Sequence, residues 1–117
     1  MTSVLIVDDE PMLREELQES LELEDFAVTP AENVNHALKL CETEDYDFVV
    51  TDLKMPVRGG LELIAELKQQ GHPAMCIVVS GHGAESSRDA ALSLGAKACF
   101  AKPLNVDDLI ETINAHI

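Results

Sequence analysis

The chain has 117 residues, the size of one domain, so residues 1–117 are expected to form a single folding unit. Its 8 Lys and Arg stand against 22 Asp and Glu, and the formal net charge of −14 argues against direct binding to DNA or RNA. No apolar run approaches the ~20 residues of a transmembrane helix, and the N-terminus lacks a signal-peptide pattern, so no membrane association is expected. Three widely spaced cysteines without a C-x-x-C pair predict reduced thiols and a cytoplasmic protein.

The first half of the chain predicts three strands and two helices. Apolar runs place the strands at 3–7, 26–29 and 48–51. Pro11 suits the first position of one helix, and Asn33 can cap the other. The inward positions recur at helical spacing: Leu13, Leu17 and Leu21 in the first helix, and Val34, Ala37, Leu38 and Cys41 in the second. The acids of the first helix, Glu15, Glu16, Glu19 and Glu22, are expected to face solvent.

The second half continues the alternation. A third helix follows Gly59-Gly60, with Leu61, Ile64, Ala65 and Leu67 inward and Gly71 as its stop. Strands at 75–79 and 98–101 flank a fourth helix from about Glu85 to Leu94, whose apolar stripe of Ala90, Ala91 and Leu94 is thin. Asn105 caps the last helix, with Val106, Leu109, Ile110, Ile113 and Ile117 in helical register. Five strands alternating with five helices imply a parallel sheet covered by helices on both sides.

Polar residues follow or end the apolar runs at the edge where an open parallel sheet binds its ligands. They are Asp8, Asp9, Asp52, Ser80 and Lys102. Three carboxylates at one edge repel one another unless a cation lies among them, and oxygen ligands without His or Cys favour Mg²⁺. A metal, a lysine and a hydroxyl can hold the oxygens of a phosphoryl group, so the set suggests phosphoryl transfer to Asp52.

These residues resemble the motifs of the response-regulator receiver domain, the flavodoxin-like module of two-component signalling. The motifs are Asp8-Asp9, Asp52-x-x-Met55-Pro56-x-x-x-Gly60, Ser80 ending the fourth strand and Lys102-Pro103 ending the fifth, and they cover essentially the whole chain. The resemblance implies a (βα)5 doubly wound sheet with strand order 2-1-3-4-5. It also implies a phosphoacceptor domain, not an enzyme in the usual sense, whose chemistry is limited to its own phosphorylation and dephosphorylation.

The resemblance further implies that Asp52 accepts a phosphoryl group from the phosphohistidine of a sensor histidine kinase or a histidine phosphotransfer protein. Asp9 and Asp52 would ligate Mg²⁺ together with the backbone carbonyl of Lys54, and Asp8 would act partly through water. Lys102 would pair with the phosphoryl group, aimed by a cis peptide bond before Pro103.

The switch implied by the resemblance begins at Ser80, which would move toward the phosphoryl oxygens and shift the Gly81-His82-Gly83 loop and the fourth helix. This movement would change contacts with a downstream output domain or protein. Lys54 and His82 occupy positions that, in similar receivers, tune how long the phosphoryl group survives.

Two positions depart from the family pattern. Cys99 stands where receivers usually carry Tyr or Phe, and Phe100 should point to the other face of the sheet. We interpret Cys99 as a small buried hydrophobic residue in preference to a redox sensor, and signalling by an aromatic rotation is in question. Arg58 replaces a common apolar residue and is either a solvated loop charge or a partner contact.

The remaining aromatic and imidazole side chains are assigned to packing or to the surface. Tyr46 is expected to pack in the core, and His36, His72 and His116 are expected at the surface because they lack metal-ligand spacing.

Two other functions could use a related sheet. The nearest alternative is a small phosphohydrolase with an aspartyl nucleophile, which should show Asp-x-Asp after the first strand and a cap insertion. Asp8-Asp9-Glu10-Pro11 supplies neither feature. A flavin carrier would need a phosphate-binding loop after the first strand and aromatic flanks, and only 3% of this chain is aromatic.

Overall fold

Parallel strands form one five-stranded sheet in the computed structural model, which describes residues 1–81 and 85–117. The strands are β1 (Ser3–Val7), β2 (Ala27–Ala31), β3 (Phe48–Asp52), β4 (Met75–Ser80) and β5 (Ala98–Ala101). Their order is β2-β1-β3-β4-β5, which confirms the predicted topology. After β1 the chain adds β2 on one side of that strand and then adds β3 on its other side. Ligands bind where the strand order switches in this way, so the binding edge is expected at the carboxyl ends of β1 and β3.

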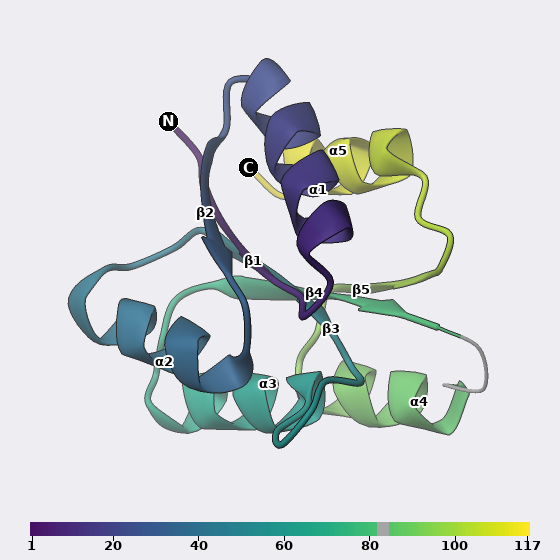
Figure 1. The fold of residues 1–117 in the computed structure, drawn as a ribbon. Helices are drawn as coiled ribbons and strands as arrows, with labels where there is room; N and C mark the ends of the chain where they lie inside the picture. The colour runs from purple at the N-terminus through teal and green to yellow at the C-terminus, as the bar shows by residue number, and fades with distance from the viewer. Residues whose placement is uncertain (82–84) are drawn as a thin grey trace.

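Helices cover both faces of the sheet (Figure 1). They are α1 (Pro11–Leu23), α2 (Val34–Thr43), α3 (Gly60–Gln69), α4 (Glu85–Ser93) and α5 (Val106–Ala115). Figure 1 shows α1 and α5 on one face and α2, α3 and α4 on the other. None of the helices among the described residues is long and apolar enough to cross a membrane.

Each face of the sheet packs its own hydrophobic core because successive side chains of a strand point to opposite faces. One core joins Leu5, Val7, Val49 and Val78 to α2, α3 and α4. The other joins Val4, Ile6, Val50 and Ile77 to α1 and α5. The central strand β3 is buried along its whole length, which explains why it begins with the apolar run Phe48-Val49-Val50.

The local start and stop signals of the helices are confirmed. Asn33 Oδ1 accepts a hydrogen bond of 2.8 Å from the backbone N–H of His36, and Asn105 Oδ1 accepts one of 2.9 Å from that of Asp107. Pro11 begins α1. Gly71, which follows α3, has a φ of +69°, a backbone conformation that glycine adopts more easily than other residues.

Several boundaries and burial assignments differ from prediction. Strand β2 extends to Ala31 through Pro30, which an edge strand tolerates because one side of its backbone needs no partner strand. On α3 Ile64 and Leu67 are buried as predicted and Leu63 joins them, whereas Leu61 and Ala65 are only half-buried. Helix α5 ends at Ala115, so Ile117 lies beyond it and is exposed.

His72 is the other correction, because its side chain is only 5% exposed. Its Nδ1 accepts a hydrogen bond of 3.1 Å from the backbone N–H of Ala74. The contact fixes the turn between α3 and β4, which sequence spacing could not indicate. Tyr46 is buried as predicted, and its hydroxyl donates to Glu44.

Candidate functional site

Three carboxylates meet at the carboxyl edge of the sheet. Val7 pairs with Thr51 in the β1–β3 ladder, so Asp8 and Asp52, the next residues of each chain segment, lie beside one another. The side chains of Asp8, Asp9 and Asp52 each place one oxygen within 4.8 Å of the other two. Asp8 and Asp52 are buried, at 3% and 6% exposure, whereas Asp9 is exposed. The predicted convergence of the three acids is therefore present.

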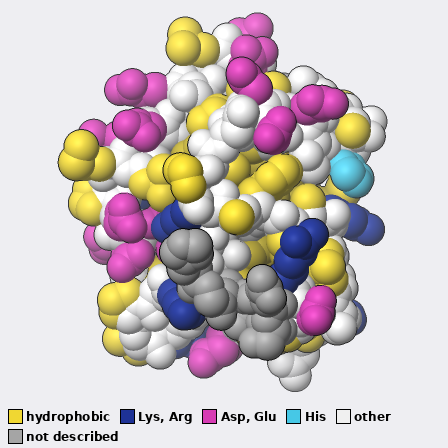
Figure 2. Space-filling model, turned by 90° about the vertical axis from the view of Figure 1, so that its right-hand side faces the viewer, with side chains coloured by type: hydrophobic (Ala, Val, Ile, Leu, Met, Phe, Trp, Pro, Cys, Tyr) yellow, Lys and Arg dark blue, Asp and Glu magenta, His cyan; other side chains and the backbone are white. Residues whose placement is uncertain are grey.

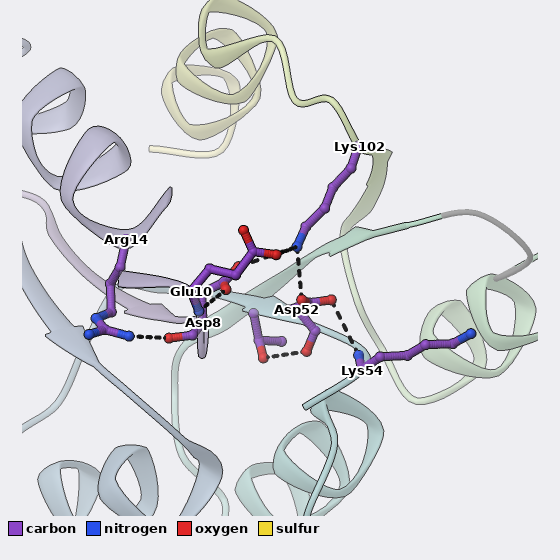
Figure 3. A network of polar contacts seen from close by, with 7 residues as sticks. Asp8, Glu10, Arg14, Asp52, Lys54 and Lys102 are labelled. Carbon is purple, nitrogen blue, oxygen red and sulfur yellow. Dashed lines mark hydrogen bonds and ion pairs between the residues drawn. The ribbon is translucent and has the colours of Figure 1, made fainter. Parts of the chain in front are cut away.

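Lys102 reaches this cluster from the end of β5 (Figure 3). Its Nζ donates a hydrogen bond of 2.9 Å to Asp52 Oδ2 and lies 3.6 Å from Asp8 Oδ2. The backbone N–H of Lys102 also donates to the carbonyl of Ser80, which joins the ends of β5 and β4. The peptide bond between Lys102 and Pro103 is cis, as expected.

Burial and charge act against each other in the cluster. Burial, the largest influence, raises the pKa of the Asp8 carboxyl, while the N–H of Glu10 and the charge of Lys102 partly oppose that rise. Burial lowers the pKa of Lys102, but its hydrogen bond to Asp52 and the charges of Asp8, Asp52 and Glu10 together outweigh burial and raise it. The site therefore holds an excess of negative charge that one lysine offsets only in part.

The donor atoms fit a small divalent cation. Oxygen ligands around one Mg²⁺ lie at about 2.1 Å from the ion and hence up to about 4.2 Å from one another, a spacing that the acid cluster permits. The cluster contains carboxylate oxygens and neither His nor Cys, which is the donor chemistry of Mg²⁺. Asp9 also lines a pocket of about 300 Å³ between α1, α2 and the chain after β3, which would give an ion a route from solvent.

Lys54 touches the central carboxylate through its backbone and not through its side chain. Its N–H donates a hydrogen bond of 3.2 Å to Asp52 Oδ1, so each oxygen of Asp52 has one donor. The side chain of Lys54 is exposed and points away from Asp52 (Figure 3).

Ser80 ends β4, one residue beyond the partner of Asp52 in the β3–β4 ladder, and is buried. Its position matches the prediction that it lies at the same edge as Asp52. His82, predicted to modulate the site, lies outside the described residues.

Cys99 and Phe100 point to opposite faces, as strand alternation predicted, because Cys99 packs with the α2, α3 and α4 core and Phe100 with the α1 and α5 core. Cys99 is half-buried, less than a core residue would be, and burial raises the pKa of its thiol. Burial likewise raises the pKa of Cys41 and of Cys76 to about 11, so both thiols stay protonated at neutral pH. These environments favour packing roles over redox chemistry.

Two residues of the site, Glu10 and Arg14, were not predicted from the sequence. Glu10 Oε1 lies 3.8 Å from Lys102 Nζ, so a third acid of the β1–α1 turn faces the lysine. Arg14 Nη1 donates a hydrogen bond of 2.6 Å to the carbonyl of Asp8 and holds that turn against α1 (Figure 3). Their only signal in the sequence was their closeness to Asp8-Asp9.

Arg58 is not a freely solvated loop charge, because its guanidinium makes three contacts within the chain and only 26% of its side chain is exposed. Its Nε lies 2.8 Å from Glu62 Oε2, its Nη2 contacts Glu66, and its Nη1 donates a hydrogen bond of 3.0 Å to Asn35 Oδ1. Both acids belong to α3 and Asn35 belongs to α2, so the residue links two helices to the chain after β3.

Comparison with known proteins gives one consistent result. The family model of the response regulator receiver domain matches residues 4–114. The transcriptional regulatory protein CpxR of Klebsiella pneumoniae is 34% identical over 98% of this chain and 49% of its own length. The KDP operon transcriptional regulatory protein KdpE of Escherichia coli is 36% identical over 93% of this chain and 48% of its own length. The chain thus spans about half the length of these relatives.

A solved structure agrees in both sequence and shape. The response regulator protein TrrA of Thermotoga maritima, determined in complex with Mg²⁺-BeF, is 32% identical with a TM-score of 0.89, and the match covers 100% of both chains.

Proposed function

The chain belongs to the family of response regulator receiver domains, and from this premise we propose that Asp52 is its phosphoacceptor in two-component signalling. The observation that carries the proposal is the contact of 2.9 Å between Lys102 Nζ and Asp52 Oδ2 inside the cluster of three acids. A buried carboxylate that faces both a lysine and two further carboxylates is equipped to receive a phosphoryl group and to have its charge offset.

In the proposed reaction the phosphoryl group moves from the nitrogen of a phosphohistidine to a carboxylate oxygen of Asp52. The P–N bond breaks as the O–P bond forms, and the imidazole nitrogen keeps the electron pair and takes up a proton. Lys102 would exchange its contact with Asp52 Oδ2 for one with a phosphoryl oxygen. Mg²⁺ held by Asp8, Asp9, Asp52 and the carbonyl of Lys54 would supply further positive charge next to the phosphoryl oxygens.

The proposed readout uses Ser80, whose hydroxyl would turn toward the phosphoryl oxygens and alter the segment between β4 and α4. Helix α4 suits this role because its stripe is thin, with Ala91 as its fully buried residue among the side chains described. The altered surface would act on an output domain or protein, and the phosphoryl donor would be a histidine kinase or a histidine phosphotransfer protein. With a net charge of −14, this domain is proposed to bind neither nucleic acid nor membrane directly.

The test is labelling with a small-molecule phosphodonor, acetyl phosphate, in the presence of MgCl₂, followed by intact-mass spectrometry. Wild type should gain one phosphoryl group and Asp52→Asn should gain none. Cys99→Ala serves as a matched control and should be labelled like wild type, because Cys99 is outside the acid cluster. Equal labelling of wild type and Asp52→Asn would refute the assignment.

The phosphohydrolase alternative makes a different prediction with phosphomonoesters. A hydrolase would release many equivalents of phosphate per chain from p-nitrophenyl phosphate, whereas a phosphoacceptor domain would release at most a slow, near-stoichiometric amount. Sustained turnover that depends on Asp52 would favour the alternative.

A further inference from the structure

The chain between β3 and α3, which we call the β3–α3 segment (residues 53–59), leaves Asp52 and returns to it. At its start, the N–H of Lys54 donates to Asp52 Oδ1 at 3.2 Å. At its end, the N–H of Gly60 donates to the carbonyl of Leu53 at 3.0 Å. Both ends of the segment are therefore attached beside Asp52, and the path of residues 55–58 between them helps to hold the backbone of Lys54 next to the acid cluster.

The middle of the segment contains a strained turn. The N–H of Arg58 donates a hydrogen bond of 2.8 Å to the carbonyl of Pro56, and Val57 between them has a φ of +71°. This pattern is a γ-turn with positive φ, which is rare and strained, and a β-branched residue is poorly suited to it. Val57 is 93% exposed, so burial of its own side chain does not compensate for the strain.

The side chain of the next residue, Arg58, can offset the strain at Val57. Arg58 makes three side-chain contacts, to Glu62 and Glu66 on α3 and to Asn35 on α2. These partners belong to helices that pack against the sheet, so they offer a rigid support for a planar guanidinium that donates in several directions. Only 26% of the Arg58 side chain is exposed, so water is partly excluded from these contacts.

We propose that Arg58 is a positioning residue that holds the strained turn at Val57, and with it the β3–α3 segment, in the geometry that Mg²⁺ binding requires. The inference rests on the proposed function, since the metal site is part of it. Arg58, which stands where receivers commonly carry an apolar residue, would thus support the metal site.

Charge and positioning predict opposite effects of removing Arg58. A positive charge near an acid cluster disfavours cation binding, so its loss would by charge alone strengthen binding of Mg²⁺. Loss of positioning would weaken it, because the segment could relax out of the strained turn.

The experiment measures the Kd for Mg²⁺ by isothermal titration calorimetry, without phosphorylation, on folded variants checked by circular dichroism. Arg58→Ala should bind Mg²⁺ about tenfold more weakly than wild type, the lower end of the range seen when groups supporting metal ligands are removed. Arg58→Lys should also bind more weakly, because one ammonium cannot keep all three directed contacts. Lys68→Ala is the matched control, because it also removes one positive charge. Lys68 lies on α3 and has no ion pair among the described residues, so this variant should bind Mg²⁺ no more weakly than wild type.

A second change tests the strain directly. Asn tolerates positive φ better than Val, so Val57→Asn combined with Arg58→Ala should recover most of the lost affinity. Wild-type or tighter binding by Arg58→Ala, or no recovery in the double variant, would overturn the inference while leaving the phosphoacceptor assignment intact. Failure of wild type itself to bind Mg²⁺ would overturn both.

Discussion

Asp8 is the residue at which burial and charge conflict most directly. The residue is 3% exposed and burial raises its pKa, which means that the folded protein disfavours the ionised carboxylate relative to the unfolded chain. At pH 7, above the unfolded pKa of 3.8, ionised Asp8 therefore lowers the free energy of unfolding. Bringing the carboxylates together at this site therefore lowers the stability of the folded protein.

We predict that Asp8→Asn is more stable than wild type when EDTA removes divalent ions. The amide removes the cost of burying a charge and the repulsion from Asp52 and Asp9, which together outweigh the lost attraction of Lys102, and its oxygen can still accept the N–H of Glu10. A Tm higher by a few degrees is expected by calorimetry.

Millimolar MgCl₂ should raise the Tm of wild type by ligand linkage and raise that of Asp8→Asn much less. A lower Tm of Asp8→Asn in EDTA would contradict this account of the cluster.

At the scale of elements, the junction between β3 and α3 depends on close approach of backbone to backbone. A Cβ added to Gly60 would lie 2.2 Å from the carbonyl oxygen of Asp52, a contact that cannot exist without moving one of the two elements. Glycine at the first position of α3 thus lets the helix begin directly behind the central carboxylate.

Gly60→Ala is therefore expected to destabilise the protein by about 2 kcal/mol or more, since overpacking against backbone forces main-chain shifts. The measurement is the midpoint of urea unfolding at constant m-value.

Gly81→Ala is the matched control, because a Cβ there would meet no atom of the described residues within 4 Å. Its midpoint should stay near that of wild type. Equal losses in the two variants would show that general glycine effects, and not the approach to Asp52, decide the result.

For the whole molecule, the dominant property is the net charge of −14 on a body of 32 × 31 × 27 Å. Figure 2 shows Asp and Glu side chains gathered over the upper part of one face, where Figure 1 places α1 and α5. At about 0.01 M ionic strength the Debye length is about 30 Å, so repulsion acts across the entire molecule, whereas at about 0.1 M it is about 10 Å.

Stability should therefore rise with salt over this range, by a few degrees in Tm as measured by differential scanning fluorimetry. Choline chloride should act like NaCl, which separates screening from occupation of the acid cluster by a small cation. A fall in Tm with salt would mean that ion pairs such as those of Arg58 and Lys102 outweigh the general repulsion.

The features that depend on local spacing were predictable from the amino-acid sequence. Alternating apolar runs and helical stripes predicted ten elements in the right order, and strand alternation placed Cys99 and Phe100 on opposite faces. Since parallel strands bring their carboxyl ends to one edge, the residues that end or follow β1, β3, β4 and β5 could be assigned to one site from the sequence.

Contacts between residues that are distant in the sequence, and the directions of side chains that spacing does not encode, became visible only in the folded chain. The partners of Arg58 on α2 and α3, the burial of the His72 side chain and the approach of Glu10 to Lys102 all depend on how elements pack across one another. Periodicity fixes which face of an element is apolar, but the direction of a long polar side chain depends on neighbours that only the folded chain brings within reach.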